Sequence, residues 1–310
     1  MHSPAEIPRT GISPQAAAWL AANPPAPGRE ITLANAAELR KAVRDGWAPA
    51  IARARAEFDV TERIIALDGV ECLEVTPQAS PVDGCVLYFF GGGHTVGSPE
   101  EDLMVIAPLA AEAGVRVVAP RYPLAPERPY PAALHTAEST YRTLLHSTDP
   151  AAVVVAGESA GGNLALALFQ RIRAAGLAMP TAFALLSPWA DLGFGGDSHA
   201  TDRDPTLVLA DGSLEEMAAL YRGDTAADDP LVSPIHADFT GMPPTIMTTG
   251  TRDLLLSDVV RLETAMRLDG VDVTLRVWEG MWHVFEFYRE LPEARASMTE
   301  VARFVAAQLA

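Results

Sequence analysis

Short apolar runs alternate with longer amphipathic segments from about residue 60 to the C-terminus. Runs rich in β-branched and aromatic side chains predict the strands Arg63–Leu67, Val70–Val75, Cys85–Phe90, Val115–Ala119, Ala152–Ala156, Ala182–Ser187, Thr245–Thr249 and Val273–Trp278. Segments with apolar side chains at helical spacing predict the helices Pro99–Ala113, Pro131–His146, Ala160–Ala175 and Ser257–Leu268, and a terminal helix that ends near Leu309. Strands that alternate with helices form a mostly parallel sheet covered on both faces, so the pattern predicts the α/β fold class.

The helix predicted to begin at Pro99 carries clear start signals. Ser98 stands in the N-cap position, and Glu101, three residues later, completes a capping box. We therefore expect this helix to begin directly after the glycine-rich segment that precedes it.

The first 60 residues follow a different pattern. They are rich in Ala and Pro, they predict helices over Pro14–Ala22 and Leu33–Phe58, and they hold no convincing strand. We expect residues 1–60 to form N-terminal cap helices and residues 61–310 to form the α/β domain.

A second segment interrupts the alternation inside the α/β domain. Asp191–Phe239 is rich in Asp, Gly and Pro, and it separates two strands by far more residues than a usual connection. We expect residues 191–240 to form a cap insertion. Together with the N-terminal helices it would cover a site at the carboxyl ends of the strands, where open α/β sheets bind ligands.

A candidate nucleophile lies at the end of a predicted strand. Gly157-Glu158-Ser159-Ala160-Gly161 follows four apolar residues and opens the next predicted helix. A tight strand-to-helix turn of this kind needs small neighbours and projects the serine hydroxyl above the sheet edge. The alternative is a glycine-rich turn with an incidental serine.

Three consecutive glycines, Gly91 to Gly93, follow the strand at Cys85–Phe90. Bare backbone N–H groups of this kind can stabilise the oxyanion of an acyl-transfer intermediate. The N–H groups of Gly92, Gly93 and Ala160 are our candidate donors. A flexible loop or a phosphate cradle is the alternative, although no GxxxxGK[ST] pattern follows.

Acyl transfer by a serine also needs a base and an acid that orients it. Among the seven histidines, His283 alone lies in a loop between the last predicted strand and the terminal helix, and His94 is the second choice. Asp253 follows the strand at Thr245–Thr249 and is our candidate acid, with Asp258 and Asp191 as alternatives. The order Ser159, Asp253, His283 is the order found in α/β-hydrolases.

Residues that contact a substrate are harder to choose from the sequence. We name His94, Trp189 and Tyr221 as candidate substrate-binding residues, and the apolar side chains of the insertion favour a hydrophobic acyl group or ring. A cap whose apolar side chains pack against one another is an equally good interpretation.

Composition and charge exclude several other functions. The 23 Lys and Arg against 40 Asp and Glu give a net charge of −17, which repels phosphate backbones and anionic lipid. We therefore expect no nucleic-acid partner and no membrane association. Cys72 and Cys85 lack the spacing of a metal or redox site, and no basic, apolar leader or long apolar run is visible. These features predict a globular cytoplasmic protein without a metal.

Taken together, the motifs resemble the bacterial hormone-sensitive-lipase-like esterases, family IV of the α/β-hydrolases. The resemblance covers roughly residues 60–310. It is carried by Gly91–Gly93 with Gly97-Ser98, by Tyr122–Glu127, by Gly157–Asn163 and by Gly280–Phe285. It implies an α/β-hydrolase fold and a carboxylesterase with Ser159, Asp253 and His283 as its triad. It also implies a helical cap, no metal and no organic cofactor.

The sequence departs from the family pattern in two places. Phe90 stands where the family usually has the histidine of HGGG, so packing by its ring must hold the loop. Arg121 and Pro123 stand where the family usually has Asp and Arg, which puts the ion-pair support of that segment in doubt.

Several alternatives stay open at this stage. The Gly280–Phe285 segment is similar to that of lactone hydrolases and small-ester esterases, which does not fix the substrate; we expect a small to medium hydrophobic ester or a lactone. An acyltransferase would use the same triad, and a non-catalytic small-ligand receptor could use the same scaffold. The family resemblance also leaves a homodimer open.

Overall fold

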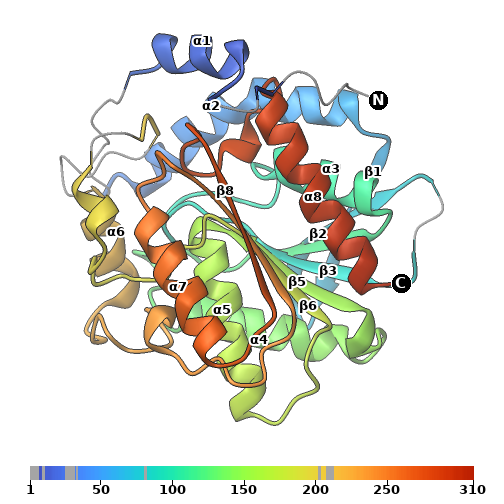
Figure 1. The fold of residues 1–310 in the computed structure, drawn as a ribbon. Helices are drawn as coiled ribbons and strands as arrows, with labels where there is room; N and C mark the ends of the chain where they lie inside the picture. Colours follow the sequence, from blue (N-terminus) through green and yellow to red (C-terminus); the bar gives the residue numbers. More distant parts are fainter. Residues whose placement is uncertain are drawn as a thin grey trace.

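The computed structural model describes residues 7–8, 11–24, 32, 34–79, 82–201, 204–206 and 213–310. One twisted sheet runs through the molecule, and helices pack around it (Figure 1). The strands are β1 (Val60–Leu67), β2 (Val70–Pro77), β3 (Cys85–Phe89), β4 (Arg116–Pro120), β5 (Val153–Glu158), β6 (Ala182–Leu186), β7 (Thr245–Gly250) and β8 (Val273–Trp278). The helices are α1 (Pro14–Ala22), α2 (Ala36–Glu57), α3 (Leu103–Ala113), α4 (Ala132–Leu144), α5 (Ser159–Ala174), α6 (Ser213–Arg222), α7 (Leu256–Leu268) and α8 (Pro292–Gln308). Short 3₁₀ turns are η2 (Pro150–Ala152), η3 (Asp197–Ala200), η4 (Pro234–His236) and η5 (Phe285–Phe287).

The sheet has eight strands in the order β1-β2-β4-β3-β5-β6-β7-β8. The pairs β1–β2 and β2–β4 are antiparallel, and all the others are parallel, as the sequence predicted. Every residue of β3, β5 and β6 is buried, which requires cover on both faces of the sheet. Helix α3 packs on α8, and α4 packs on α5, to supply that cover.

The predicted start of the helix after the glycine-rich loop was wrong. Helix α3 begins at Leu103, a full turn after Pro99. The Ser98 hydroxyl bonds the Glu101 carboxylate at 3.0 Å, and the side chain of Asp102 makes no cap hydrogen bond. Instead, Asp102 accepts a hydrogen bond from the buried Tyr88 hydroxyl at 2.8 Å, which turns this carboxylate into the core. The Asp102 carboxylate therefore contacts strand β3 instead of capping the helix.

Helix α1 packs on the loop that follows β8. The Ser13 side chain caps α1 and also bonds the Glu293 carboxylate at 2.9 Å. The Trp19 ring stacks on Trp282 with centroids 4.0 Å apart. The N-terminal segment is thereby attached to the C-terminal third of the chain.

Helix α2, drawn in blue near α1 in Figure 1, contacts the loops that follow β3 and β4. Its Arg40 donates to the carbonyl oxygens of Thr95 and Ala125 and forms an ion pair with Glu127 at 2.7 Å. The predicted start of this helix at residue 33 lies outside the described residues, and its last helical residue is Glu57 rather than Phe58. No helix within the described part of the chain combines the length and the apolar composition needed to cross a lipid bilayer.

Candidate active site

The turn between β5 and α5 holds Ser159 in a strained backbone conformation. Its φ of +50° lies in the left-handed region that side chains other than glycine rarely adopt. A Cβ atom at Gly161 would overlap the carbonyl oxygens of Phe89 and Phe90, and one at Gly157 would approach the carbonyl oxygen of Gly161 to 2.5 Å. The two glycines allow the helix to pack tightly against the strands, and the serine is left at the top of the turn.

Three residues that are far apart in the sequence meet at this turn. His283 Nε2 lies 2.8 Å from Ser159 Oγ, and His283 Nδ1 lies 3.0 Å from Asp253 Oδ1. Asp253 also accepts hydrogen bonds from the Thr249 hydroxyl and from the Leu255 backbone N–H, each at 2.9 Å. An imidazole that donates from Nδ1 to Asp253 leaves Nε2 free to accept the serine proton.

The electrostatics of the pair favour the charged form of both partners. Burial raises the pKa of the Asp253 carboxyl, but the adjacent His283 and several hydrogen bonds outweigh it and leave this pKa below its usual range. Burial lowers the pKa of His283, but Asp253, Asp204 and Glu286 outweigh it and leave this pKa above its usual value.

The alternative acids are used elsewhere in the structure. Asp258 lies 2.7 Å from His199 and also accepts the backbone N–H of Asp191. Asp191 forms an ion pair with Arg261 at 2.7 Å. Asp253 is therefore the carboxylate among these three that contacts His283.

The glycine loop after β3 has an unusual backbone. Gly92 and Gly93 have φ values of +96° and +60°. Within the described part of the chain, the backbone N–H groups of Gly92, Gly93 and Ala160 donate no hydrogen bond. These three N–H groups therefore stay our candidate donors to an oxyanion.

The aromatic ring of Phe90 packs as expected at the start of this loop. It stacks on Tyr122 with centroids 4.1 Å apart and an interplanar angle of 10°, and the Tyr122 hydroxyl donates to the Phe90 carbonyl oxygen at 2.5 Å. Arg121 forms ion pairs with Glu71 and Glu100, so the segment that departs from the family pattern has ionic support from other partners.

Two buried carboxyl groups behind the loop were missed by the sequence analysis. A Cβ at Gly91 would overlap the carboxyl group of Glu158, so Glu158 lies directly against the backbone of the loop. It also faces Asp102, which accepts a hydrogen bond from the Tyr88 hydroxyl. Burial raises the pKa of Asp102 to about 7 and raises the pKa of Glu158 well above its usual range. The acidic residue directly before Ser159 was the signal that could have revealed this pair.

The three candidate substrate-binding residues form one buried aromatic group. His94 stacks on Tyr221 with centroids 3.6 Å apart and lies 6.4 Å from the Trp189 ring. The Trp189 backbone N–H donates to the carbonyl oxygen of Ser159 at 3.0 Å, which places this group beside the nucleophile. Burial lowers the pKa of His94 to about 3, so it is neutral at physiological pH. All three rings are almost fully buried, and their contact with substrate stays a prediction.

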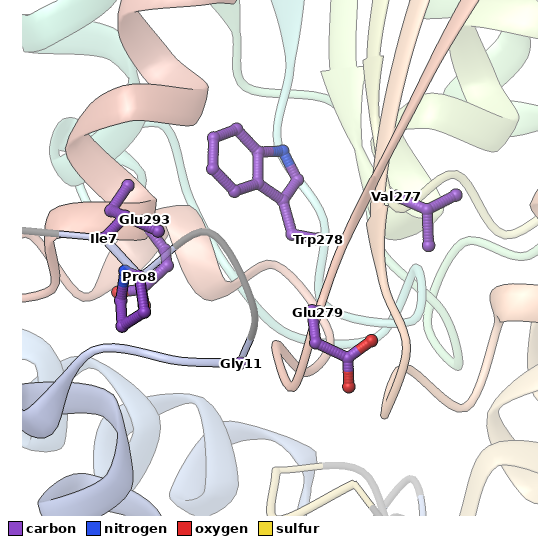
Figure 2. A pocket seen from close by; sticks show the side chains of 7 residues that line it. All are labelled: Ile7, Pro8, Gly11, Val277, Trp278, Glu279 and Glu293. Carbon is purple, nitrogen blue, oxygen red and sulfur yellow. The ribbon is translucent and has the colours of Figure 1, made fainter. Parts of the chain in front are cut away.

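The cavity drawn in Figure 2 lies away from this chemistry. It has a volume of about 490 Å³ and is lined by Ile7, Pro8, Gly11, Val277, Trp278, Glu279 and Glu293. None of Ser159, Asp253 and His283 contributes to its wall. Among the described residues, no group of three or more His, Cys, Asp or Glu side chains is arranged to hold a metal ion.

The sheet topology, the strained serine turn and the serine–histidine–aspartate contacts define an α/β-hydrolase. The model of the alpha/beta hydrolase fold family matches residues 86–287, and the chain belongs to this family. It is 38% identical over 222 residues to an acetyl-hydrolase of Streptomyces hygroscopicus. This alignment covers 71% of this chain and 74% of that protein. It is 32% identical over 245 residues to an esterase of Acinetobacter venetianus, which covers 78% of this chain and 80% of that protein.

Solved structures agree with these relatives. An esterase from the bacterial hormone-sensitive lipase family superposes with a TM-score of 0.84 at 30% identity, over 96% of this chain and 99% of that one. The esterase EstE5, soaked with p-nitrophenyl butyrate, superposes with a TM-score of 0.85 at 28% identity and with the same coverage. The protein is thus a carboxylic ester hydrolase similar to the hormone-sensitive-lipase esterases, which confirms the predicted fold, family and reaction class.

Proposed function

We propose that Ser159, His283 and Asp253 are the catalytic triad of this ester hydrolase, with the N–H groups of Gly92, Gly93 and Ala160 as its oxyanion hole. The observation that carries the proposal is the continuous chain of contacts from Ser159 Oγ through the His283 imidazole to Asp253, at 2.8 and 3.0 Å.

The geometry supports a two-step reaction. In acylation, Ser159 Oγ attacks the ester carbonyl and its proton passes to His283 Nε2. The carbonyl oxygen becomes an oxyanion that the three N–H groups stabilise, and His283 then gives the proton to the departing alcohol. In deacylation, His283 takes a proton from water, the hydroxide attacks the acyl-enzyme, and the proton returns to Ser159 as the acid is released. Asp253 stays ionised and stabilises the imidazolium in both steps.

We infer that the substrate is a small to medium hydrophobic ester or a lactone. The Met217 side chain of α6 lies so close to Gly93 that a Cβ there would overlap its sulfur atom. An apolar side chain therefore stands over the proposed oxyanion hole, next to the His94–Tyr221 stack. The acetyl-hydrolase relative and the EstE5 structure soaked with p-nitrophenyl butyrate support a short acyl group.

We also propose that residues 1–60 and 191–240 act as the cap. Trp19 stacks beside the His283 loop, and Met217 lies against the glycine loop, so both segments reach the proposed site.

The remaining expectations concern partners and location. We expect no nucleic-acid partner, which the net charge of −17 supports, and a cytoplasmic location, which the free, buried thiols of Cys72 and Cys85 support. A homodimer stays an open alternative.

The first experiment measures hydrolysis of p-nitrophenyl butyrate by the wild type, Ser159→Ala and Ser139→Ala. Ser139 bonds Asp68 at an exposed position and serves as the control. We expect a loss of kcat of at least about 10³-fold in Ser159→Ala and no change in Ser139→Ala. Equal activity in Ser159→Ala and the wild type would contradict the triad assignment.

The same assay separates the alternatives that share this scaffold. Added methanol yields methyl butyrate in excess over butyrate if the enzyme is an acyltransferase, whereas a hydrolase forms mainly the acid. A panel of p-nitrophenyl acetate, butyrate and octanoate with a small lactone, ranked by kcat/KM, tests the substrate class.

A further inference from the structure

A buried carboxylate from the predicted cap insertion lies between the two loops that carry Asp253 and His283. Asp204 is fully buried. Its Oδ2 accepts the backbone N–H of His283 at 2.9 Å and the backbone N–H of Leu254 at 3.2 Å. One oxygen atom therefore connects the backbone of the proposed base to the residue directly after the proposed acid.

The other oxygen of this carboxylate is held from the insertion itself. Asp204 Oδ1 accepts both the backbone N–H and the side-chain hydroxyl of Thr206, each at 2.8 Å. Hydrogen bonds to a charged acceptor are stronger than those between neutral groups. The carboxylate thus joins three segments, namely the insertion and the loops after β7 and β8.

Asp204 also acts on His283 through its charge. The groups that face the imidazole are the Ser159 hydroxyl at Nε2, Asp253 at Nδ1, and the carboxyl groups of Asp204 and Glu286. After burial, which lowers the pKa of His283, Asp253 raises it most and Asp204 contributes next.

Glu286 is less well placed to provide this charge. Burial raises its pKa, and its Oε1 accepts the hydroxyls of Thr248 and Ser297. On the other side, Asp204 faces the buried Tyr288 phenol, whose pKa is raised by burial and then by this carboxylate. Asp204 is therefore the main source of negative charge beside His283 apart from the proposed triad acid.

We propose that Asp204 is a positioning residue for ester hydrolysis, which holds the Asp253 and His283 loops at the separation the triad needs and stabilises the imidazolium formed when His283 takes the Ser159 proton. This inference rests on the proposed triad.

Asp204→Asn is the main test variant, because it keeps the size of the side chain but removes its charge. The asparagine has a single amide oxygen as acceptor. This oxygen can accept hydrogen bonds either from the backbone N–H groups of His283 and Leu254 or from Thr206, but not from both sides. Neutral His283 is the active base, so activity falls as the pH drops through its pKa. Loss of a nearby negative charge lowers that pKa. We therefore expect the acidic limb of kcat/KM to move to lower pH by roughly half a unit to one unit.

The plateau rate provides a second readout in the same variant. We expect kcat at the pH optimum to fall about 10-fold or more, because charge-assisted hydrogen bonds to the base loop are lost. KM should change little, since Asp204 is buried and both of its carboxylate oxygens accept hydrogen bonds from the protein. Asp238→Asn is the matched control, because this aspartate lies in the same predicted insertion and its exposed side chain pairs with Arg173. The Asp238→Asn variant should leave unchanged both kcat at the pH optimum and the pH midpoint of the acidic limb of kcat/KM.

Thr206→Val keeps the test decisive if Asp204→Asn does not fold. Thr206 is exposed, and the substitution removes one donor to Asp204 at nearly constant volume. We expect a loss of kcat of about 2- to 5-fold.

The outcomes separate the two proposals. A folded Asp204→Asn variant with wild-type kcat and pH midpoint would overturn the role of Asp204, as would an unchanged kcat in Thr206→Val when the first variant does not fold. If such a result is obtained while Ser159→Ala is inactive in the same assay, the proposed role of Asp204 is wrong and the proposed triad stands. Full activity in Ser159→Ala overturns both proposals, because Asp204 then has no base to position.

Discussion

At the scale of single residues, the loop that starts at Phe90 is held at its first residue by Tyr122. The Phe90 ring stacks on Tyr122, and the Tyr122 hydroxyl donates to the Phe90 carbonyl oxygen. The next three residues are the glycines proposed to supply oxyanion donors, which have no side chains of their own to hold them. Tyr122 therefore holds the first residue of this loop through both its ring and its hydroxyl group.

Tyr122→Phe tests this anchor by removing one hydroxyl group. The buried carbonyl oxygen of Phe90 loses its donor, which costs about 1–3 kcal/mol of unfolding free energy. Small shifts of the Gly92 and Gly93 N–H groups should lower kcat about 10-fold, since a lost oxyanion donor has effects of 10²-fold or more. The measurements are kcat for p-nitrophenyl butyrate and the urea-unfolding free energy.

Tyr141→Phe is the control for this prediction. The Tyr141 hydroxyl donates to the carbonyl oxygen of Ala178 at 2.7 Å, so the same chemical change is made outside the site. It should lower stability without lowering kcat. An equal effect of both variants on kcat would argue against a specific role for Tyr122.

At the scale of elements, helix α1 forms part of the wall behind the proposed base. Trp19 stacks on Trp282, the residue directly before His283, and also contacts Tyr288 edge-on with centroids 4.7 Å apart. The sequence predicted the bounds of α1 correctly, because Ser13, Pro14 and the alanine run are local signals. It could not predict which surface the helix covers.

Trp19→Ala tests whether α1 supports the His283 loop. Aromatic pairs contribute about 0.5–1.5 kcal/mol beyond their buried area, so we expect a lower unfolding free energy and a decrease in kcat/KM of about 3- to 10-fold. Trp19→Phe keeps a stacked ring and should restore most of the activity. Near-UV circular dichroism reports the loss of the tryptophan stack. A changed dichroism spectrum with unchanged kcat/KM would show that α1 adds stability alone.

The elements that were predicted less well are those whose ends depend on distant partners. The start of α3 was placed at Pro99 on local signals, whereas the helix begins at Leu103, after Asp102 has bonded the buried Tyr88 hydroxyl. Similarly, β1 begins at Val60 rather than Arg63, because it pairs with β2 over its whole length although none of its residues is buried. Apolar periodicity is weak in such an edge strand.

At the scale of the whole molecule, the net charge of −17 acts on every substrate. The field of an acidic protein lowers the local concentration of anions and slows their association, whereas neutral esters are unaffected. This effect is screened by salt, since the Debye length falls from about 30 Å at 0.01 M to about 8 Å at 0.15 M ionic strength.

A comparison of two esters tests the effect of this charge. We expect kcat/KM for the anionic p-nitrophenyl hydrogen succinate to rise several-fold between 0.01 and 0.15 M salt, on the order expected for screened steering. The value for neutral p-nitrophenyl acetate should stay nearly constant and serves as the control. A ratio of the two values that does not change with salt would show that local contacts, rather than net charge, control access.

The sequence alone determined the α/β alternation, the serine turn and the glycine loop of this hydrolase. These features are local, because strand and helix periods, capping residues and glycine spacing act over a few neighbouring residues. The order of the proposed triad, Ser159, Asp253 and His283, could also be inferred, since each residue follows a predicted strand at the same edge of a parallel sheet.

Only the tertiary structure decided which side chains surround these residues. Glu158 meets Asp102, Trp19 meets Trp282, and Asp204 meets the backbone of His283. Each of these contacts joins residues more than 50 positions apart, and a long-range contact depends on the packing of whole elements rather than on local propensity. For this reason the chemistry of the site could be predicted from the chain, whereas the groups that hold it in place could not.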